Sequence, residues 1–86
     1  MAKYKILIKE SAIKELENTP RKSLKQIIKR IQSLSDNPRP KGSQKLSAQE
    51  RYRIRQGDYR IIYAIRDDQA TVHVYKIGHR REVHRT

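Results

Sequence analysis

Three stretches in the second half of the chain alternate apolar and polar residues with a period of two. They are residues 52–56, 59–65 and 70–77. Such alternation is typical of β-strands that bury one face. Gly57-Asp58 separates the first two stretches, and a two-residue turn of this kind favours a tight antiparallel hairpin. Asp67-Asp68-Gln69 predicts a turn before the third strand.

The first half of the chain predicts one strand and a short helix. Residues 3–9 alternate in the same way as the later strands. We expect Ser11 to cap a short helix that runs to about residue 18, with Ile13 and Leu16 facing inward.

A second, longer helix follows. Thr19 is expected to be its N-cap and Pro20 its first residue. Its apolar residues recur at helical spacing and form one stripe: Leu24, Ile27, Ile28, Ile31 and Leu34. Residues 43–51 show no clear period.

The order of these elements, β-α-α-β-β-β, predicts an α+β fold in which an antiparallel sheet packs against two N-terminal helices. Residues 1–86 are expected to form a single small domain. Parity assigns the faces of the sheet. The apolar face should hold Tyr52, Ile54, Ile61, Tyr63, Ile65, Val72 and Val74. The opposite face should hold Arg53, Arg55, Arg60, Ile62, His73, Tyr75 and Ile77.

The charge of the chain changes this picture. The formal net charge is +12, and the basic residues are segregated by type. Nine of ten lysines lie in residues 1–50, whereas eight of eleven arginines lie in residues 51–86. A charge of this size points to nucleic acid, the ribosome or an acidic protein as partner. No stretch has the length or composition of a membrane span or a signal peptide, so we expect a cytoplasmic protein with no membrane partner.

The arginines are expected to gather in the hairpin. If Gln56 pairs with Tyr59, then Arg55 lies directly opposite Arg60, on the same face as Arg53. Like charges in this position destabilise a sheet, so we expect the face to bind an anion, and arginine forks suit phosphate. With rings and aliphatic side chains beside it, this face has the pattern of a groove for single-stranded nucleic acid.

Cofactor chemistry finds little support in the sequence. His73, His79 and His84 do not have the spacing of metal ligands, and the chain has no cysteine, glycine-rich phosphate loop or nucleophile elbow. We therefore expect no cofactor and no metal site. Metal-free phosphodiester chemistry remains possible on RNA, which supplies its own nucleophile in the 2′-hydroxyl.

Two strings of residues carry a family resemblance. Residues 52–63 (YRIRQGDYRIIY) and 72–83 (VHVYKIGHRREV) together resemble the RelE branch of the RelE/ParE toxins. The resemblance covers essentially the whole chain and implies a RelE-like fold. It also implies the toxin of a type II toxin–antitoxin pair, which enters the ribosomal A site and cleaves mRNA without metal. Its implied partners are an acidic, RelB-like antitoxin, the ribosome and mRNA, with DNA reached only through the antitoxin.

The resemblance also implies roles for individual residues. Arg53 and Arg55 match the basic pair on the first strand of the hairpin, and Arg60 matches a phosphate ligand. Arg80 matches an arginine that stabilises the transition state. His84 stands where the family often has a tyrosine that stacks on the base and assists proton transfer. We further expect contacts to RNA from this set: Arg51, Arg53, Arg55, Tyr75, His79 and Arg81.

Two other functions stay open at this point. ParE-like toxins share the fold and inhibit DNA gyrase without cleaving RNA. A non-enzymatic module that binds RNA or the ribosome is the third possibility. Mapping of cleaved mRNA ends, set against an assay of DNA supercoiling, separates the three.

Overall fold

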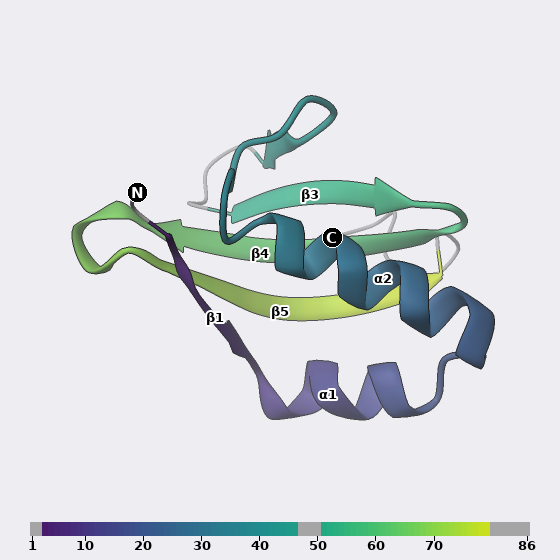
Figure 1. Cartoon of the computed structure of the whole chain (residues 1–86). Coiled ribbons are helices and arrows are strands. Elements are labelled where there is room, and N and C mark those ends of the chain that lie inside the picture. The colour runs from purple at the N-terminus through teal and green to yellow at the C-terminus, as the bar shows by residue number, and fades with distance from the viewer. Residues whose placement is uncertain (1–2, 47–50, 80–86) are drawn as a thin grey trace.

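The computed structural model describes residues 3–46 and 51–79 (Figure 1). In chain order its elements are β1 (Lys5–Ile8), α1 (Glu10–Glu17), α2 (Arg21–Ser33), β2 (Gln44–Leu46), β3 (Arg51–Gln56), β4 (Tyr59–Arg66), a 3₁₀ turn η1 (Asp67–Gln69) and β5 (Thr71–His79). The three strands predicted for the second half and both helices are present.

The strands form one sheet in the order β1-β5-β4-β3-β2. β1 pairs parallel with β5, and the other neighbours are antiparallel. The α+β class is therefore confirmed. The sheet is mixed and not wholly antiparallel as expected, because β1 runs parallel to its neighbour β5. β2 was not predicted, because its three residues, Gln44-Lys45-Leu46, are too few to show an alternating pattern.

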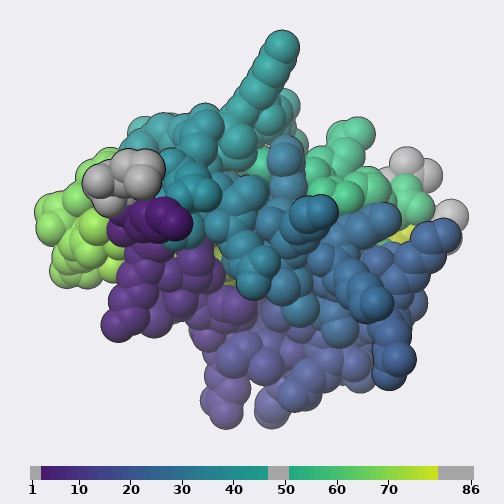
Figure 2. Space-filling view, in the orientation of Figure 1, coloured from purple at the N-terminus to yellow at the C-terminus, as the bar shows by residue number. Residues whose placement is uncertain are grey.

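The helices cover one face of the sheet (Figure 1), and Figure 2 shows their side of the molecule. The core between the two layers includes Ile27, Ile31 and Leu34 from α2 and its C-terminal end, packed with strand residues. All seven residues predicted for the apolar face belong to this core or pack against it. Tyr63 is fully buried and donates its hydroxyl to the carbonyl of Pro38 at 2.8 Å, so the ring also ties the loop after α2 to the sheet.

The start of each helix differs from the prediction. Lys9 is the N-cap of α1, and the inward positions are Ala12, with no exposed surface, and Leu16. Ile13 is 42% exposed, because a line through positions 12 and 16 leaves position 13 on the flank of the helix. Pro20 caps α2, while the hydroxyl of Thr19 instead donates to the carbonyl of Glu15 at 2.7 Å.

A β-bulge breaks the parity of β5. Tyr63 pairs with Val74 but Ile62 pairs with Lys76, so Tyr75 is the extra residue. Beyond the bulge the two faces exchange. Ile77, predicted on the outer face, is 1% exposed and lies in the core, and Lys76 takes the place on the outer face beside Ile62.

Neither helix in the described part of the chain is long and apolar enough to cross a lipid bilayer.

Candidate functional site

The hairpin of β3 and β4 brings three arginines together on the face of the sheet opposite the helices. Arg55 pairs with Arg60 across the hairpin, and Arg53 pairs with Ile62 one step further along the same face. Gly57 has a φ of 59° at the first position of the turn, where a type II′ turn requires a positive value. The predicted register and the opposition of Arg55 and Arg60 are therefore confirmed.

These arginines line a depression of about 110 Å³ together with Gly42 and Gln44. We call it the arginine depression. None of the described residues that line it is acidic. Three guanidinium groups around a small hollow create a concentrated positive potential, and their planar forks suit the oxygens of a phosphate.

The far wall of the arginine depression comes from β2 and the loop before it. Gln44 pairs with Arg53, and the Arg53 Nη2 donates to the Gln44 Oε1 at 2.7 Å. This hydrogen bond fixes the position of the guanidinium before any ligand arrives. Gln44 and Gly42 were not predicted as site residues, since nothing in residues 43–51 revealed a strand at this edge of the hairpin.

The loop that carries Gly42 is anchored at its other end by an ion pair. Arg39 donates to both carboxylate oxygens of Asp67, at 2.8 and 3.3 Å, and to the Tyr52 hydroxyl at 3.2 Å. The Tyr4 hydroxyl also donates to Asp67, at 2.6 Å. These hydrogen bonds, first from Arg39 and then from Tyr4, lower the pKa of Asp67 to about 2.

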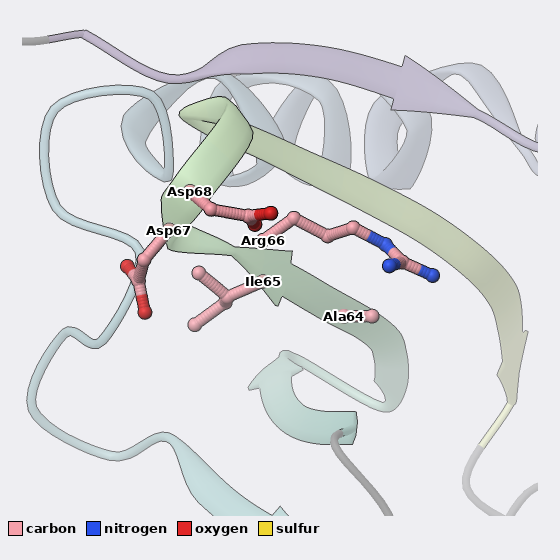
Figure 3. Close-up of a pocket in the computed structure, with 5 residues that line it drawn as sticks. All are labelled: Ala64, Ile65, Arg66, Asp67 and Asp68. Carbon is pink, nitrogen blue, oxygen red and sulfur yellow. The ribbon is translucent and has the colours of Figure 1, made fainter.

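The turn that carries Asp67 has no part in the arginine depression. A hollow of about 380 Å³ lies along its other side and is lined by Ala64, Ile65, Arg66, Asp67 and Asp68. In Figure 3 the carboxylate of Asp67 points away from the carboxylate of Asp68 and from the side chain of Arg66. The lining of this hollow mixes carboxylates with an arginine, unlike that of the arginine depression. Since the carboxylate of Asp67 pairs with Arg39, we assign Asp67 to the anchoring of the loop.

Two further predicted residues, Arg51 and Tyr75, meet on the outer face. The Arg51 guanidinium lies over the Tyr75 ring, with its carbon 4.3 Å from the ring centroid. His73 lies beside the same ring, with the two centroids 4.8 Å apart.

His79 lies elsewhere. It pairs with Tyr59 and meets that ring edge-on, with centroids 5.6 Å apart. Because Tyr59 packs against the core, His79 lies beside the helix layer, whereas Arg51 and Tyr75 lie on the opposite face. The remaining predicted site residues, Arg80, Arg81 and His84, lie outside the described residues.

This fold and this arginine-lined hollow define a small, strongly basic α+β protein with a cluster of arginines on one face of its sheet. Residues 6–84 match the family model of the ParE toxin of the type II toxin–antitoxin system parDE. The chain belongs to this family of the RelE/ParE superfamily and is thus a toxin of the type II toxin–antitoxin class. No curated protein matches the chain by sequence.

Solved structures of RelE toxins share the fold. The toxin–antitoxin complex RelBE2 from Mycobacterium tuberculosis matches with 24% identity and a TM-score of 0.82, over 92% of this chain and 93% of that one. The archaeal RelE–RelB complex from Pyrococcus horikoshii matches with 23% identity and a TM-score of 0.79, over 93% and 97%. A free mutant of the E. coli toxin RelE matches with 21% identity and a TM-score of 0.81, over 95% and 88%.

The family model thus carries the ParE description, and these structures are of RelE toxins. Both results fall within the RelE/ParE superfamily, so the resemblance found in the sequence is confirmed at the level of the superfamily. Two of the three structures are complexes with an antitoxin.

Proposed function

We propose that this toxin is a metal-free endoribonuclease that enters the ribosomal A site and cleaves the mRNA there. The observation that carries the proposal is the arginine depression, in which Arg53, Arg55 and Arg60 converge and none of the described lining residues is acidic. A structural role alone gives no reason to oppose Arg55 and Arg60 directly, because like charges in that position destabilise the sheet.

The chemistry follows from what arginine can do. The 2′-oxygen of the substrate attacks the adjacent phosphorus and the bond to the 5′-oxygen breaks, which leaves a 2′,3′-cyclic phosphate and a 5′-hydroxyl. Negative charge grows on the phosphoryl oxygens in the transition state, and Arg60 and Arg55 are placed to stabilise it. Gln44 holds Arg53 for the same task.

The two proton transfers need other groups. Guanidinium stays protonated at any physiological pH and makes a poor base. We assign proton transfer to His84, because imidazole is a common general acid and base, or to groups of the ribosome. The ribosome also accounts for substrate positioning, and it places the action of the toxin in the cytoplasm.

We also propose that the partner of this chain is an acidic antitoxin. The support is the net charge of +12 together with the antitoxins present in the structures of similar toxins. Opposite net charge speeds encounter and suppresses wrong pairings. The antitoxin should cover the arginine depression, since inhibition requires that the phosphate site be closed.

A cleavage assay on programmed ribosomes tests the enzymatic proposal. Wild-type toxin is mixed with ribosomes that hold a defined codon in the A site, and the ends of the mRNA are mapped. We expect cleavage within that codon, a cyclic phosphate end, and no cleavage when the scissile nucleotide carries a 2′-deoxyribose. Arg60→Ala should abolish cleavage, and Arg66→Ala, at the far end of β4, should not. Efficient cleavage of the deoxy substrate would exclude attack by the 2′-hydroxyl.

Inhibition of DNA gyrase is the second candidate, and the ParE description of the matching family favours it. A supercoiling assay with purified gyrase separates the two. Inhibited supercoiling by wild-type toxin, with intact mRNA on the ribosome, would replace the endoribonuclease proposal.

A further inference from the structure

A second basic pocket lies on the outer face of the sheet, beside the arginine depression. Its volume is about 270 Å³. Its walls bring together three cations, Lys9, Arg51 and Lys76, with the Tyr75 ring and the Ile62 side chain. We call it the tyrosine pocket. Its cations come from three places in the chain, which are the residue before α1, the start of β3 and the part of β5 just after the bulge.

The charge of the tyrosine pocket is positive. Glu15 is the acidic residue among its described lining residues, and both of its oxygens are engaged. One accepts from the Lys76 Nζ at 3.2 Å and the other from the Ile77 backbone N–H at 2.8 Å. Lys76 and Glu15 therefore neutralise each other, while Lys9 and Arg51 keep the pocket attractive to an anion.

The pocket also offers a flat surface for stacking. The guanidinium carbon of Arg51 lies 4.3 Å from the centroid of the Tyr75 ring, and the Lys9 ammonium nitrogen lies 6.0 Å from the same centroid. Ile62 provides an apolar floor that is 2% exposed. RNA-binding proteins hold unpaired bases on aromatic rings and on arginine planes, with cations nearby for the phosphates.

We propose that the tyrosine pocket binds one nucleotide of single-stranded RNA, with its base on the Tyr75–Arg51 platform and its phosphate near Lys9. The proposal rests on the proposed function, since the nucleotide belongs to the strand whose scissile phosphate occupies the arginine depression. Arg51 and Arg53 share one face of β3, so their backbones are separated by about 7 Å along the strand. A stacked nucleic acid strand advances about 3.4 Å per nucleotide, so the bound nucleotide lies one or two positions from the scissile phosphate.

An acidic peptide is the competing occupant. Carboxylates need the cations but gain little from a flat ring over an aliphatic floor. The combination of a ring, a guanidinium plane and an apolar floor therefore favours a base over an acidic side chain.

A thermodynamic cycle on the free, full-length toxin tests the proposal. Binding of a fluorescent, fully 2′-O-methylated RNA octamer is measured, and the methyl groups prevent cleavage. A set of octamers, each with one abasic position, is then measured with wild type, Tyr75→Leu and Tyr75→Phe. We expect one abasic position to weaken binding to wild type and Tyr75→Phe by roughly fivefold to a hundredfold, the range for one stacked base. With Tyr75→Leu, the same abasic position should leave the binding affinity almost unchanged.

Charge is tested separately in case the Tyr75→Leu protein does not fold. Lys9→Gln should lower the slope of log affinity against log salt by about 0.7, the value for one phosphate contact on single strands. Lys22→Gln, on the opposite layer in α2, makes the same charge change and should alter the slope less.

The outcomes are distinct. If an abasic position lowers RNA affinity equally in wild type and in Tyr75→Leu, no base stacks on Tyr75 and the proposal is overturned. Weakened binding of the antitoxin by Tyr75→Leu with unchanged binding of RNA would also overturn it, because the pocket would then bind protein. If the proposed function is wrong, the mRNA on the ribosome stays intact. The octamer measurements use the free toxin and do not depend on that result.

Discussion

Replacement of Arg55 by glutamine should separate function from stability more cleanly than any other change in the arginine depression. Arg55 is exposed and lies directly opposite Arg60, so its charge costs stability. Side chains so paired have Cβ atoms about 5 Å apart. Two unit charges 5–7 Å apart in water repel by about 0.6–0.8 kcal/mol. Arg55→Gln removes this repulsion and keeps a long polar side chain on the strand.

Salt should control the gain in stability. With a Debye length of about 30 Å at 10 mM and 8 Å at 0.15 M, the repulsion falls to about 0.6 and then about 0.3 kcal/mol. At 1 M salt it should be below about 0.2 kcal/mol. Urea unfolding at the three concentrations measures this, since guanidinium chloride would itself screen the charges. A double-mutant cycle of Arg55→Gln and Arg60→Gln isolates the interaction energy between the two arginines, because the effect of any other contact of Arg60 cancels in the cycle.

Activity should move in the opposite direction. Loss of one group that stabilises the transition state costs about 2–4 kcal/mol, which slows single-turnover cleavage on the ribosome roughly 30- to 800-fold. Arg66→Gln, the same substitution at the exposed end of β4, is the control and should change neither quantity. If Arg55→Gln lowers stability equally at all salt concentrations, Arg55 makes a structural contact. Wild-type cleavage by the variant would remove Arg55 from the site.

Substitutions at three further positions test the framework that holds the site. Glu15→Ala should destabilise the protein by about 2–3 kcal/mol, because the Ile77 N–H loses a charged acceptor, whereas Glu15→Gln keeps an acceptor and should cost less than half as much in the same urea titration. Ala70→Gly should stabilise it by about 0.5–1 kcal/mol, since Ala70 has a left-handed φ of 48°, and a thermal melt should show a higher Tm. The pKa of Asp67 is lowered to about 2 by Arg39 and Tyr4, below its value of 3.8 in an unfolded chain, so its contribution to stability should be complete above about pH 4 and lost as the pH falls towards 2. Asp67→Asn should remove this acid dependence, and an equally steep acid transition in the variant would contradict the assignment.

The hairpin could be predicted because its sequence signals are local. A two-residue turn fixes which residues face each other, so Gly57-Asp58 was enough to place Arg55 against Arg60. The apolar stripe of α2 was equally local. The pairing of Arg39 with Asp67 had no such signal, because the two residues are far apart in sequence and each fits an ordinary loop or turn.

The helix starts were harder to predict from sequence. Ser11 and Thr19 are good capping residues, yet neither caps a helix here. The prediction that Ile13 faces inward, made because its side chain is large and apolar, was also wrong. Ala12 is fully buried at the position facing β5, where α1 packs closely, and a larger side chain is left on the flank.

The bulge in β5 is the difference that matters most for the site. Strict alternation would place Ile77 on the outer face beside Ile62, next to the arginine depression. One extra residue, Tyr75, reverses this, so that Ile77 enters the core and Lys76 faces outward opposite Ile62. The bulge also leaves the Ile77 N–H to be satisfied from outside the sheet, and Glu15 of α1 supplies the acceptor while pairing with Lys76. A single inserted residue thus exchanges an apolar side chain for a cation on the outer face and couples α1 to the pocket that forms there. No parity rule applied to one strand can anticipate this, because the signal for the bulge lies in its partner strand and in a carboxylate of a distant helix.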